Sequence, residues 1–362
     1  MYDMVMALQW VNDNIESFGG DKKRITLFGE SAGSVAVSLL CISPLTSGLF
    51  SKAILQSATA VFLKTDQLQP NLDLSQRLAE AVGCASQTKT IEKYPESVVG
   101  CLRSKTAVHL ARVLWSFDPT STTSFFPQYG DDLLPRNALD EIREGNFHDV
   151  PLLIGNNNDE GSFIITTREP EVFGFFGHKN PIINKTHAED MIRSIFRGFD
   201  NPEKYVEYYL GGIRDDDYGA IKRQVYIATG DRTILCVTVY FAESYAERKN
   251  NVYFYFFSHI PSNTVWSSDV GVAHTDEIQF VFGRPIRKPL LYEPAEVELS
   301  SKMIKVWTNF AKNGIPSDSF HWPKYSRKNP TYVNIDTDFT GESYGTGPHL
   351  ENCNLMRDHF GF

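Results

Sequence analysis

The spacing of apolar residues in the first part of the chain predicts alternating helices and strands. Residues 1–18 carry apolar side chains at helical spacing on a face expected to pack in the core, and this helix ends at Gly19-Gly20. The apolar runs 24–28 and 53–56 are short enough for strands, and residues 34–40 between them have helical spacing. The chain therefore begins with both element types in alternation.

The same alternation continues through the rest of the chain. Residues 252–257 are β-branched or aromatic and too few for a helix, which suits a strand buried on both faces. The other expected elements are helices over 72–82, 187–228 (broken at Gly211-Gly212), 233–246 and 296–312, and strands over 151–155 and 331–335. Strands that alternate with helices favour an α/β fold with a mostly parallel central sheet flanked by helices.

The pentapeptide from Gly29 to Gly33 has the pattern Gly-x-Ser-x-Gly between an expected strand and an expected helix. This order is typical of a nucleophile elbow, a tight turn that strains the serine backbone and needs small residues two positions before and after it. Ser31 Oγ would then stand at a helix N-terminus, where free N–H groups favour negative charge on an attacked carbonyl. The alternative is a glycine-rich turn with an ordinary capping serine.

A serine nucleophile needs a base and a carboxylate that orients the base. In this fold the chain order is Ser, acid, His. Glu160 follows the strand 151–155 and is the acid candidate, with Asp159 as its rival by position. His274 lies in a polar break before an apolar run and is the best-placed base, while His259 directly follows the strand 252–257. Position along the chain leaves both choices open.

Composition narrows the class of protein further. Apolar residues make up 42% and charged residues 22% of the 362 positions, as in a globular protein with a large core. The net charge of −9 argues against nucleic acid or an anionic membrane as a partner. No apolar stretch approaches the roughly 18 residues of a membrane span. No signal peptide is visible, and a chain that starts inside a helix is expected to be the middle of something longer.

Several short sequence motifs together resemble those of the type-B carboxylesterase and cholinesterase family. In chain order they are Ala7-Leu8-Gln9-Trp10-Val11, Phe18-Gly19-Gly20-Asp21, Phe28 to Gly33, Ala53 to Ser57, Asp159-Glu160-Gly161-Ser162-Phe163, Gly271-Val272-Ala273-His274 and Phe280 to Gly283. The resemblance runs from residue 1 to near the C-terminus. It implies an α/β-hydrolase fold, one domain over residues 1–362 without its N-terminal strands, and hydrolysis of carboxylic esters.

The resemblance assigns roles that spacing leaves open. Ser31 matches the nucleophile, Glu160 the triad acid and His274 the base. Ala32 follows the nucleophile, so its backbone N–H is expected to donate to the oxyanion. Ser57 matches a polar group behind the triad. The expected reaction passes through an acyl-enzyme that water hydrolyses.

The resemblance also suggests where substrate binds. Glu30 resembles the buried acidic neighbour of the serine in cholinesterases, and Phe163 and Trp266 fall at positions that are aromatic around the cholinesterase gorge. Plain core packing is the alternative for the two aromatic residues. Ser121 and Thr123 match positions where cholinesterases carry bulky acyl-pocket aromatics. A wider acyl pocket favours a broad carboxylesterase over a dedicated acetylcholinesterase.

The resemblance also implies two disulfides and an oxidising compartment. The expected pairs are Cys84–Cys101 and Cys236–Cys353, with Cys41 left as a buried free thiol. Asn184-Lys185-Thr186 then becomes a candidate glycosylation site in a secreted or lumenal protein. The expected partner is a small-molecule ester, with no metal, no cofactor and a homodimer as a candidate assembly. Asp215-Asp216-Asp217 is interpreted as a solvated surface loop.

Members of this family carry an N-terminal part that precedes the segment matching residue 1, including a Gly-rich loop with further oxyanion donors. No His-Gly-Gly or Gly-Gly-Gly word occurs here. The strand 24–28 is therefore expected to have one unpaired edge, which invites association with another chain. Two alternatives to a catalytic esterase follow: a non-catalytic adhesion or binding protein on the same fold, and a fragment without activity of its own.

Overall fold

The computed structural model of this chain describes residues 1–63, 66–117, 125–174, 177–248 and 250–362. The chain forms two compact units. The sheet unit comprises Met1–Lys64, Asp132–Leu134 and Ala138–Phe362, and the helical unit comprises Thr65–Asp131 and Pro135–Asn137. The assignment of both units to one catalytic domain stays a prediction.

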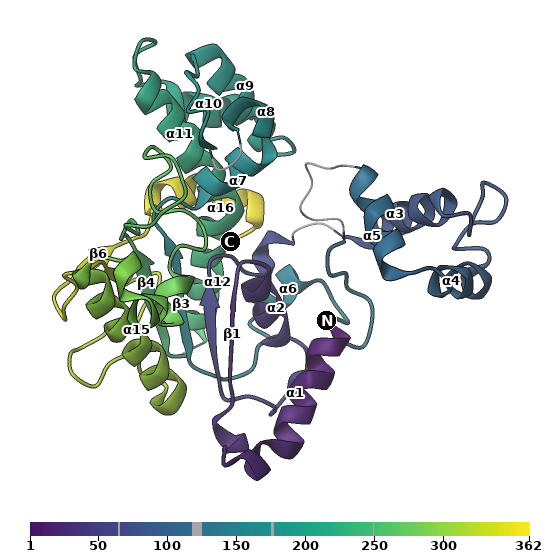
Figure 1. Cartoon of the computed structure of the whole chain (residues 1–362), viewed down its shortest axis with the longest axis horizontal. Coiled ribbons are helices and arrows are strands. Elements are labelled where there is room, and N and C mark those ends of the chain that lie inside the picture. Colours follow the sequence, from purple (N-terminus) through teal and green to yellow (C-terminus); the bar gives the residue numbers. More distant parts are fainter. Residues whose placement is uncertain (64–65, 118–124, 175–176, 249) are drawn as a thin grey trace. The chain divides into compact units, whose positions relative to one another are not determined.

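A six-stranded sheet forms the centre of the sheet unit, and its strands lie side by side in chain order (Figure 1). They are β1 (Thr26–Glu30), β2 (Lys52–Gln56), β3 (Leu152–Asn157), β4 (Val252–Phe257), β5 (Thr331–Ile335) and β6 (Tyr344–Thr346). The first five pair in parallel, and β6 pairs antiparallel to β5. The predicted α/β class with a mostly parallel sheet is confirmed.

The strands β2, β3 and β4 are buried along their whole length. On one face of the sheet, side chains such as Ile54 and Tyr255 share a core with Phe310 and Trp307 of the long helix α15 (Pro294–Asn313). Helix α15 starts with a reciprocal capping box between Glu293 and Glu296, which satisfies N–H groups of its first turn. The predicted helix 296–312 is confirmed, with its start two residues earlier.

Other helices of the sheet unit contact the strands outside that core. Helix α2 (Ala32–Leu40) packs on β1 and β2, and α12 (Cys236–Glu247) packs on β3 and β4. The further helices include α6 (Ala138–Glu144), α7 (Glu160–Arg168), α8 (Pro170–Phe173), α13 (Ile278–Val281), α14 (Arg284–Arg287) and α16 (Leu350–Phe360). Among the described residues, no helix is both long and apolar enough to cross a bilayer.

The predicted helical region 187–228 consists of three helices, α9 (Lys185–Ile195), α10 (Glu203–Leu210) and α11 (Tyr218–Gly230). The predicted break at Gly211-Gly212 is present, and a second break follows α9, where Gly198 has φ +90°. Helix α11 runs through the π-helical turn η6 (Asp231–Leu235) into α12. The predicted helix 233–246 is therefore the end of a longer interrupted helix.

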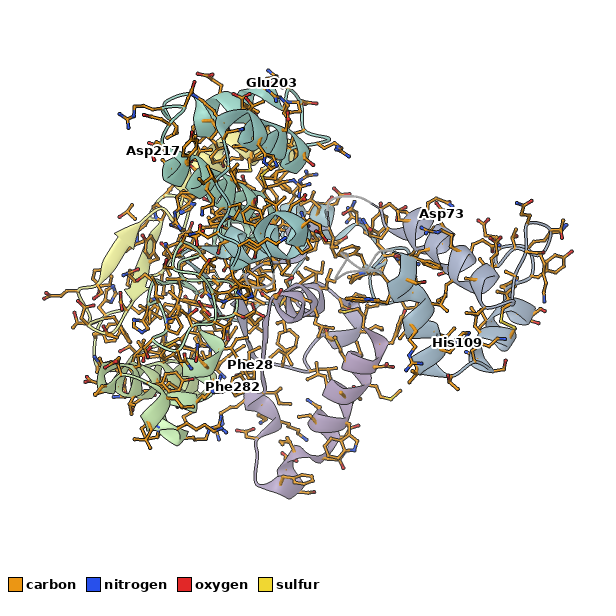
Figure 2. All side chains as sticks on the ribbon, turned by 45° about the horizontal axis from the view of Figure 1, so that its top comes forward. Phe28, Asp73, His109, Glu203, Asp217 and Phe282 are labelled. Atoms are coloured by element: carbon orange, nitrogen blue, oxygen red, sulfur yellow. A yellow bond between two sulfur atoms is a disulfide. The ribbon has the colours of Figure 1, made fainter. Side chains whose placement is uncertain are left out.

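Strand β1 is the edge of the sheet in the described part of the chain, as expected for 24–28. Phe28 on this strand is 49% exposed, and its ring lies 5.9 Å from that of Phe282; Figure 2 shows the two side chains next to each other. The preceding helix α1 (Tyr2–Asn14) buries only Leu8. The expectation that residues 1–18 pack in the core holds only in part: Val5, Val11 and Ile15 are half-buried, whereas Met4, Met6 and Trp10 are exposed.

The helical unit contains α3 (Leu68–Ala81), α4 (Pro95–Arg103) and α5 (Ala107–Phe117). The predicted helix 72–82 is confirmed, and the Cys84–Cys101 disulfide closes a 17-residue separation beside the small core of this unit. The Cys236–Cys353 disulfide joins α12 to α16 across a separation of 117 residues. Loop-closure entropy gives about 3 kcal/mol for the shorter link and about 4–5 kcal/mol for the longer one. Cys41 is free and buried, as expected.

Candidate active site

The Gly-x-Ser-x-Gly pentapeptide forms a sharp turn between β1 and α2. Ser31 has φ 57° and ψ −119°, a conformation that L-residues rarely adopt and that marks local strain. A Cβ atom on Gly29 would overlap the backbone of Gly33, whereas a Cβ on Gly33 would meet nothing within 4 Å. The steric need for a glycine therefore lies at position 29, and the expectation of the same need at position 33 is wrong. The Ser31 N–H donates to the Gln56 carbonyl on β2 at 2.9 Å.

Glu160 and His274, which are 114 residues apart in sequence, meet in the sheet unit. His274 Nδ1 lies 2.6 Å from Glu160 Oε2, and both side chains are buried. The second carboxylate oxygen, Oε1, accepts hydrogen bonds from Ser57 Oγ at 2.5 Å and from the Asn157 N–H at 2.8 Å. Both oxygens of Glu160 are thus held, and the carboxylate can fix the orientation of the imidazole.

Ser57 occupies a strained position directly after β2. Its φ is 59° and that of Ala58 is 91°, so the chain makes a left-handed turn that aims the Ser57 hydroxyl at Glu160. The turn is held by hydrogen bonds from the Ser57 N–H to Gly155 O and from the Ala58 N–H to Thr238 Oγ1. Ser57 therefore contacts the Glu160 oxygen that does not face His274.

The other imidazole nitrogen, His274 Nε2, faces the end of β1. It lies 3.2 Å from Glu30 Oε1. Neither atom has a hydrogen bond to any described residue, and the structure brings no hydrogen bond between Ser31 and His274. Because Glu30 is the residue before Ser31, Nε2 of His274 lies beside the elbow. It makes no hydrogen bond to the described residues there. Such hydrogen bonds often tighten only when substrate binds.

The two rival residues are engaged elsewhere. Asp159 pairs with Arg223 through one carboxylate oxygen and accepts the Val272 N–H at 2.8 Å through the other. His259 lies 3.0 Å from both Asp336 and Glu296. Among the described residues, no hydrogen bond or ion pair joins Asp159 or His259 to the elbow.

Three carboxyl groups act on the imidazole of His274. Burial by itself lowers the pKa of His274, but Glu160, Glu30 and Glu277 outweigh it and raise that pKa to about 9. Burial raises the pKa of Glu30 to about 8, helped by Glu277 and Glu160 and opposed by His274. Burial also raises the pKa of Asp276, to about 7. The carboxyl groups thus favour the imidazolium form of His274, while burial favours the protonated form of Glu30 and Asp276.

Glu277 is a member of this cluster that the sequence did not single out. It is fully buried and accepts hydrogen bonds from Gln56 Nε2 at 2.9 Å and Asn157 Nδ2 at 2.7 Å. Burial raises its pKa, and these two hydrogen bonds partly offset the rise. The only sequence signal is its place three residues after His274, where an acidic residue in a polar break is equally typical of a surface loop.

Two predicted aromatic residues lie beside the imidazole. The Phe163 ring is 5.5 Å from both the Trp266 ring, edge-on, and the His274 ring. Phe163 and Trp266 are half-buried, so they form a partly open wall. Ser121 and Thr123, the candidate acyl-pocket residues, lie outside the described residues.

Ala32 is the first residue of α2 and is exposed. N–H groups in the first helical turn have no partner inside the helix, so that of Ala32 can serve a developing oxyanion. Among the described residues, no group of three or more His, Cys, Asp or Glu side chains is arranged to hold a metal ion.

Sequence comparison adds an independent observation. The sequence model of the Carboxylesterase family matches residues 1–356. The chain belongs to the carboxylesterase family. Its α/β-hydrolase fold follows from this membership and agrees with the mostly parallel sheet described above.

Three curated relatives of this carboxylesterase-family chain are acetylcholinesterases. Acetylcholinesterase-1 of Trittame loki is 37% identical over 369 residues, which covers 99% of the chain and 65% of the relative. The enzyme of Leptinotarsa decemlineata is 31% identical (99% of the chain, 57% of the relative), and that of Bungarus fasciatus is 33% identical (93% and 56%). The carboxylesterase-family chain thus spans less than two thirds of the length of these relatives.

Proposed function

We propose that this protein hydrolyses carboxylic esters, with Ser31 as nucleophile, His274 as general base and then acid, and Glu160 as the carboxylate that orients His274. The observation that carries the proposal is the 2.6 Å contact between Glu160 and His274 beside a strained serine elbow. In the reaction, His274 Nε2 takes the Ser31 proton as Oγ attacks the ester carbonyl. It then returns a proton to the leaving alcohol and activates the water that hydrolyses the acyl-enzyme.

Stabilisation of the oxyanion limits the rate that this chain can reach. The Ala32 N–H supplies one donor in the proposal, and the chain contains no glycine-rich word for the others. Loss of one such donor typically costs about 3–4 kcal/mol of transition-state stabilisation. We therefore expect the 362-residue chain to form an acyl-enzyme more slowly than a protein with a complete oxyanion hole.

For the substrate, we propose a broad range of esters rather than acetylcholine alone. The reason is in the sequence, where the small residues Ser121 and Thr123 match positions at which cholinesterases carry bulky aromatic residues. Acetylcholine hydrolysis is the second candidate. It is favoured by the acetylcholinesterase relatives and by the aromatic side chains of Phe163 and Trp266, because aromatic faces bind quaternary ammonium groups.

Compartment and modification belong to the same proposal. Two disulfides suit an oxidising compartment, and we propose a secreted or lumenal location. Asn184 is exposed and caps helix α9 through Oδ1, which leaves its Nδ2 atom accessible for a glycan. A homodimer stays a prediction.

Hydrolysis of p-nitrophenyl butyrate and of acetylthiocholine by the purified chain tests the proposal. Ser31→Ala and His274→Gln should abolish turnover, while His259→Gln, the matched control on the rival histidine, should retain it. A higher kcat/KM for the butyrate ester supports broad specificity, and a higher value for acetylthiocholine supports the second candidate. Turnover that survives Ser31→Ala would reject the mechanism. A folded chain without any turnover would favour the adhesion protein or the inactive fragment.

A further inference from the structure

We propose that Asp159 is a positioning residue, which holds the backbone of the loop 271–274 and thereby fixes His274 against Glu160, with Arg223 orienting the Asp159 carboxylate. The effect on catalysis rests on the proposed function, whereas the effect on His274 itself does not. Asp159 and Glu160 are neighbours in sequence but have different roles in this inference. Asp159 holds the backbone of the loop, and Glu160 holds the imidazole of His274.

Asp159 makes two hydrogen bonds to a single residue of the loop 271–274, Val272. Asp159 Oδ2 accepts the Val272 N–H at 2.8 Å, and the Asp159 N–H donates to Val272 O at 3.0 Å. Val272 is buried and precedes His274 by two residues. Two hydrogen bonds to the same residue fix both the position and the direction of the chain just before the imidazole.

The loop is shaped around this carboxylate. Gly271 has φ +74°, and a Cβ atom at this position would overlap the carboxylate of Asp159. Thr275, on the other side of His274, also has a positive φ, 80°. His274 therefore sits between two left-handed residues, and the Asp159 side chain fills the space that a side chain at position 271 would need.

Arg223 on α11 completes the arrangement. Its guanidinium pairs with Asp159 Oδ1, and the Asp159 side chain is 4% exposed while that of Arg223 is 38% exposed. A buried carboxylate without a cation would be costly. Arg223 neutralises Asp159 and occupies one oxygen, which leaves the other oxygen directed at Val272.

Other residues hold the next position of the loop. Asn157 Nδ2 donates to Ala273 O at 2.8 Å, and Asp276 Oδ2 accepts the Ala273 N–H at 2.8 Å. These contacts do not involve Asp159, so the loop should stay near its place without the Asp159 carboxylate. What should change is the fine alignment of His274 with Glu160.

The ionisation of His274 reports that alignment. Burial lowers the pKa of His274, and contact with Glu160 is the first of the effects that raise it to about 9, followed by Glu30 and Glu277. A loop that relaxes by a fraction of an ångström weakens the hydrogen bond to Glu160 and lowers the pKa of His274. A change of charge at position 159 alone should have little effect, because Glu160, Glu30 and Glu277, and not Asp159, are the carboxyl groups that raise the pKa of His274.

The test measures the His274 imidazole by NMR titration in the full chain, together with kcat and KM for p-nitrophenyl butyrate. Asp159→Ala should lower the pKa of His274 and reduce kcat by about 100-fold with little change in KM, as expected for a misplaced catalytic group. Asp159→Asn keeps an oxygen acceptor and should retain most of the activity. Asp216→Ala removes an exposed aspartate that also pairs with an arginine, Arg214, and should change neither quantity.

Each outcome decides the inference. An unchanged His274 titration in folded Asp159→Ala would overturn it, as would equal losses in Asp159→Ala and Asp159→Asn. If Asp159→Ala does not fold, Arg223→Gln decides: a lowered pKa of His274 supports the inference and an unchanged one overturns it. If the wild-type chain turns over no ester, the proposed function fails, but the NMR titration still tests the positioning role.

Discussion

His274 is a base that the protein holds in its protonated form more strongly than usual. Its neighbours Glu160 and Glu30 contact opposite ring nitrogens, at 2.6 Å and 3.2 Å. A general base acts only when it has lost its proton, so kcat/KM should rise with pH as His274 deprotonates. With a pKa near 9, this rise should occur well above the usual 6.5 of histidine.

Glu30→Gln tests this electrostatic account. The substitution removes one of the carboxyl groups that raise the pKa of His274 but keeps its size. The rising limb of the kcat/KM profile should move to lower pH and remain above 6.5, because Glu160 is still present. The measurement is a pH–rate profile of both proteins with p-nitrophenyl butyrate. A limb that moves upward, or does not move, contradicts the account.

The elbow offers a matched pair of glycines. Gly29→Ala forces a Cβ atom into the backbone of Gly33 and should destabilise the fold by about 1–3 kcal/mol. Gly33→Ala meets open space within α2 and should be neutral or slightly stabilising, because alanine favours a helix. Thermal unfolding of both variants is the measurement. Equal losses would show that the strain is not where the structure places it.

The residues of the candidate site differ in how far sequence could identify them. The elbow was predictable from its pattern alone, since strand, Gly-x-Ser-x-Gly and helix follow directly along the chain. Glu160 and His274 needed the family resemblance, because their contact depends on two loops meeting across 114 residues. Glu277 and the pairing of Asp159 with Arg223 could not be predicted, since buried and exposed acids look alike in a sequence.

At the scale of elements, α7 is placed by its close contact with α11. A Cβ atom on Gly161 would overlap Tyr226 O and the backbone of Gly230, so only glycine lets the two helices approach this closely. Glu160 is the first residue of α7 and precedes Gly161. The distance between the helices therefore sets where the carboxylate stands relative to His274.

Gly161→Ala should destabilise the protein by about 1–3 kcal/mol and reduce ester turnover together, because it moves the start of α7. Gly219→Ala is the control within α11, since a Cβ there meets only Asp217 Oδ1 at 3.8 Å. Chemical unfolding and p-nitrophenyl butyrate hydrolysis measure the two effects. Full activity and wild-type stability in Gly161→Ala would refute the proposed role of the close contact between α7 and α11.

Helices and strands whose apolar residues recur at regular spacing were predicted from the sequence. Elements that depend on a neighbouring element in the fold were not. The strand 331–335 has the same bounds in the structure. Strand β6 has three residues without an apolar pattern and exists only because β5 offers an edge. The π-helical turn η6, which joins α11 to α12, has no sequence signal either.

At the scale of the whole molecule, the sheet ends at β1 in the part of the chain that the structure describes. Phe28 is half exposed there, and α1 exposes Met6 and Trp10 beside other apolar residues. Unpaired strand edges with apolar side chains promote association. We expect the purified chain to self-associate and Phe28→Lys to reduce this, while Leu290→Lys, at a fully exposed site elsewhere, should not. Light scattering after gel filtration measures it, and a monomeric wild-type chain would contradict the expectation.

The most direct test of the central claim is covalent labelling of the purified chain by a fluorophosphonate, read by intact mass and peptide mapping. The account predicts a single adduct on Ser31, formed faster as pH rises through the pKa of His274, and absent in Ser31→Ala. His274→Gln should slow it strongly and His259→Gln should not. A folded chain that takes up no label, or takes it up at another residue, would contradict the claim that Ser31, His274 and Glu160 act as one catalytic unit.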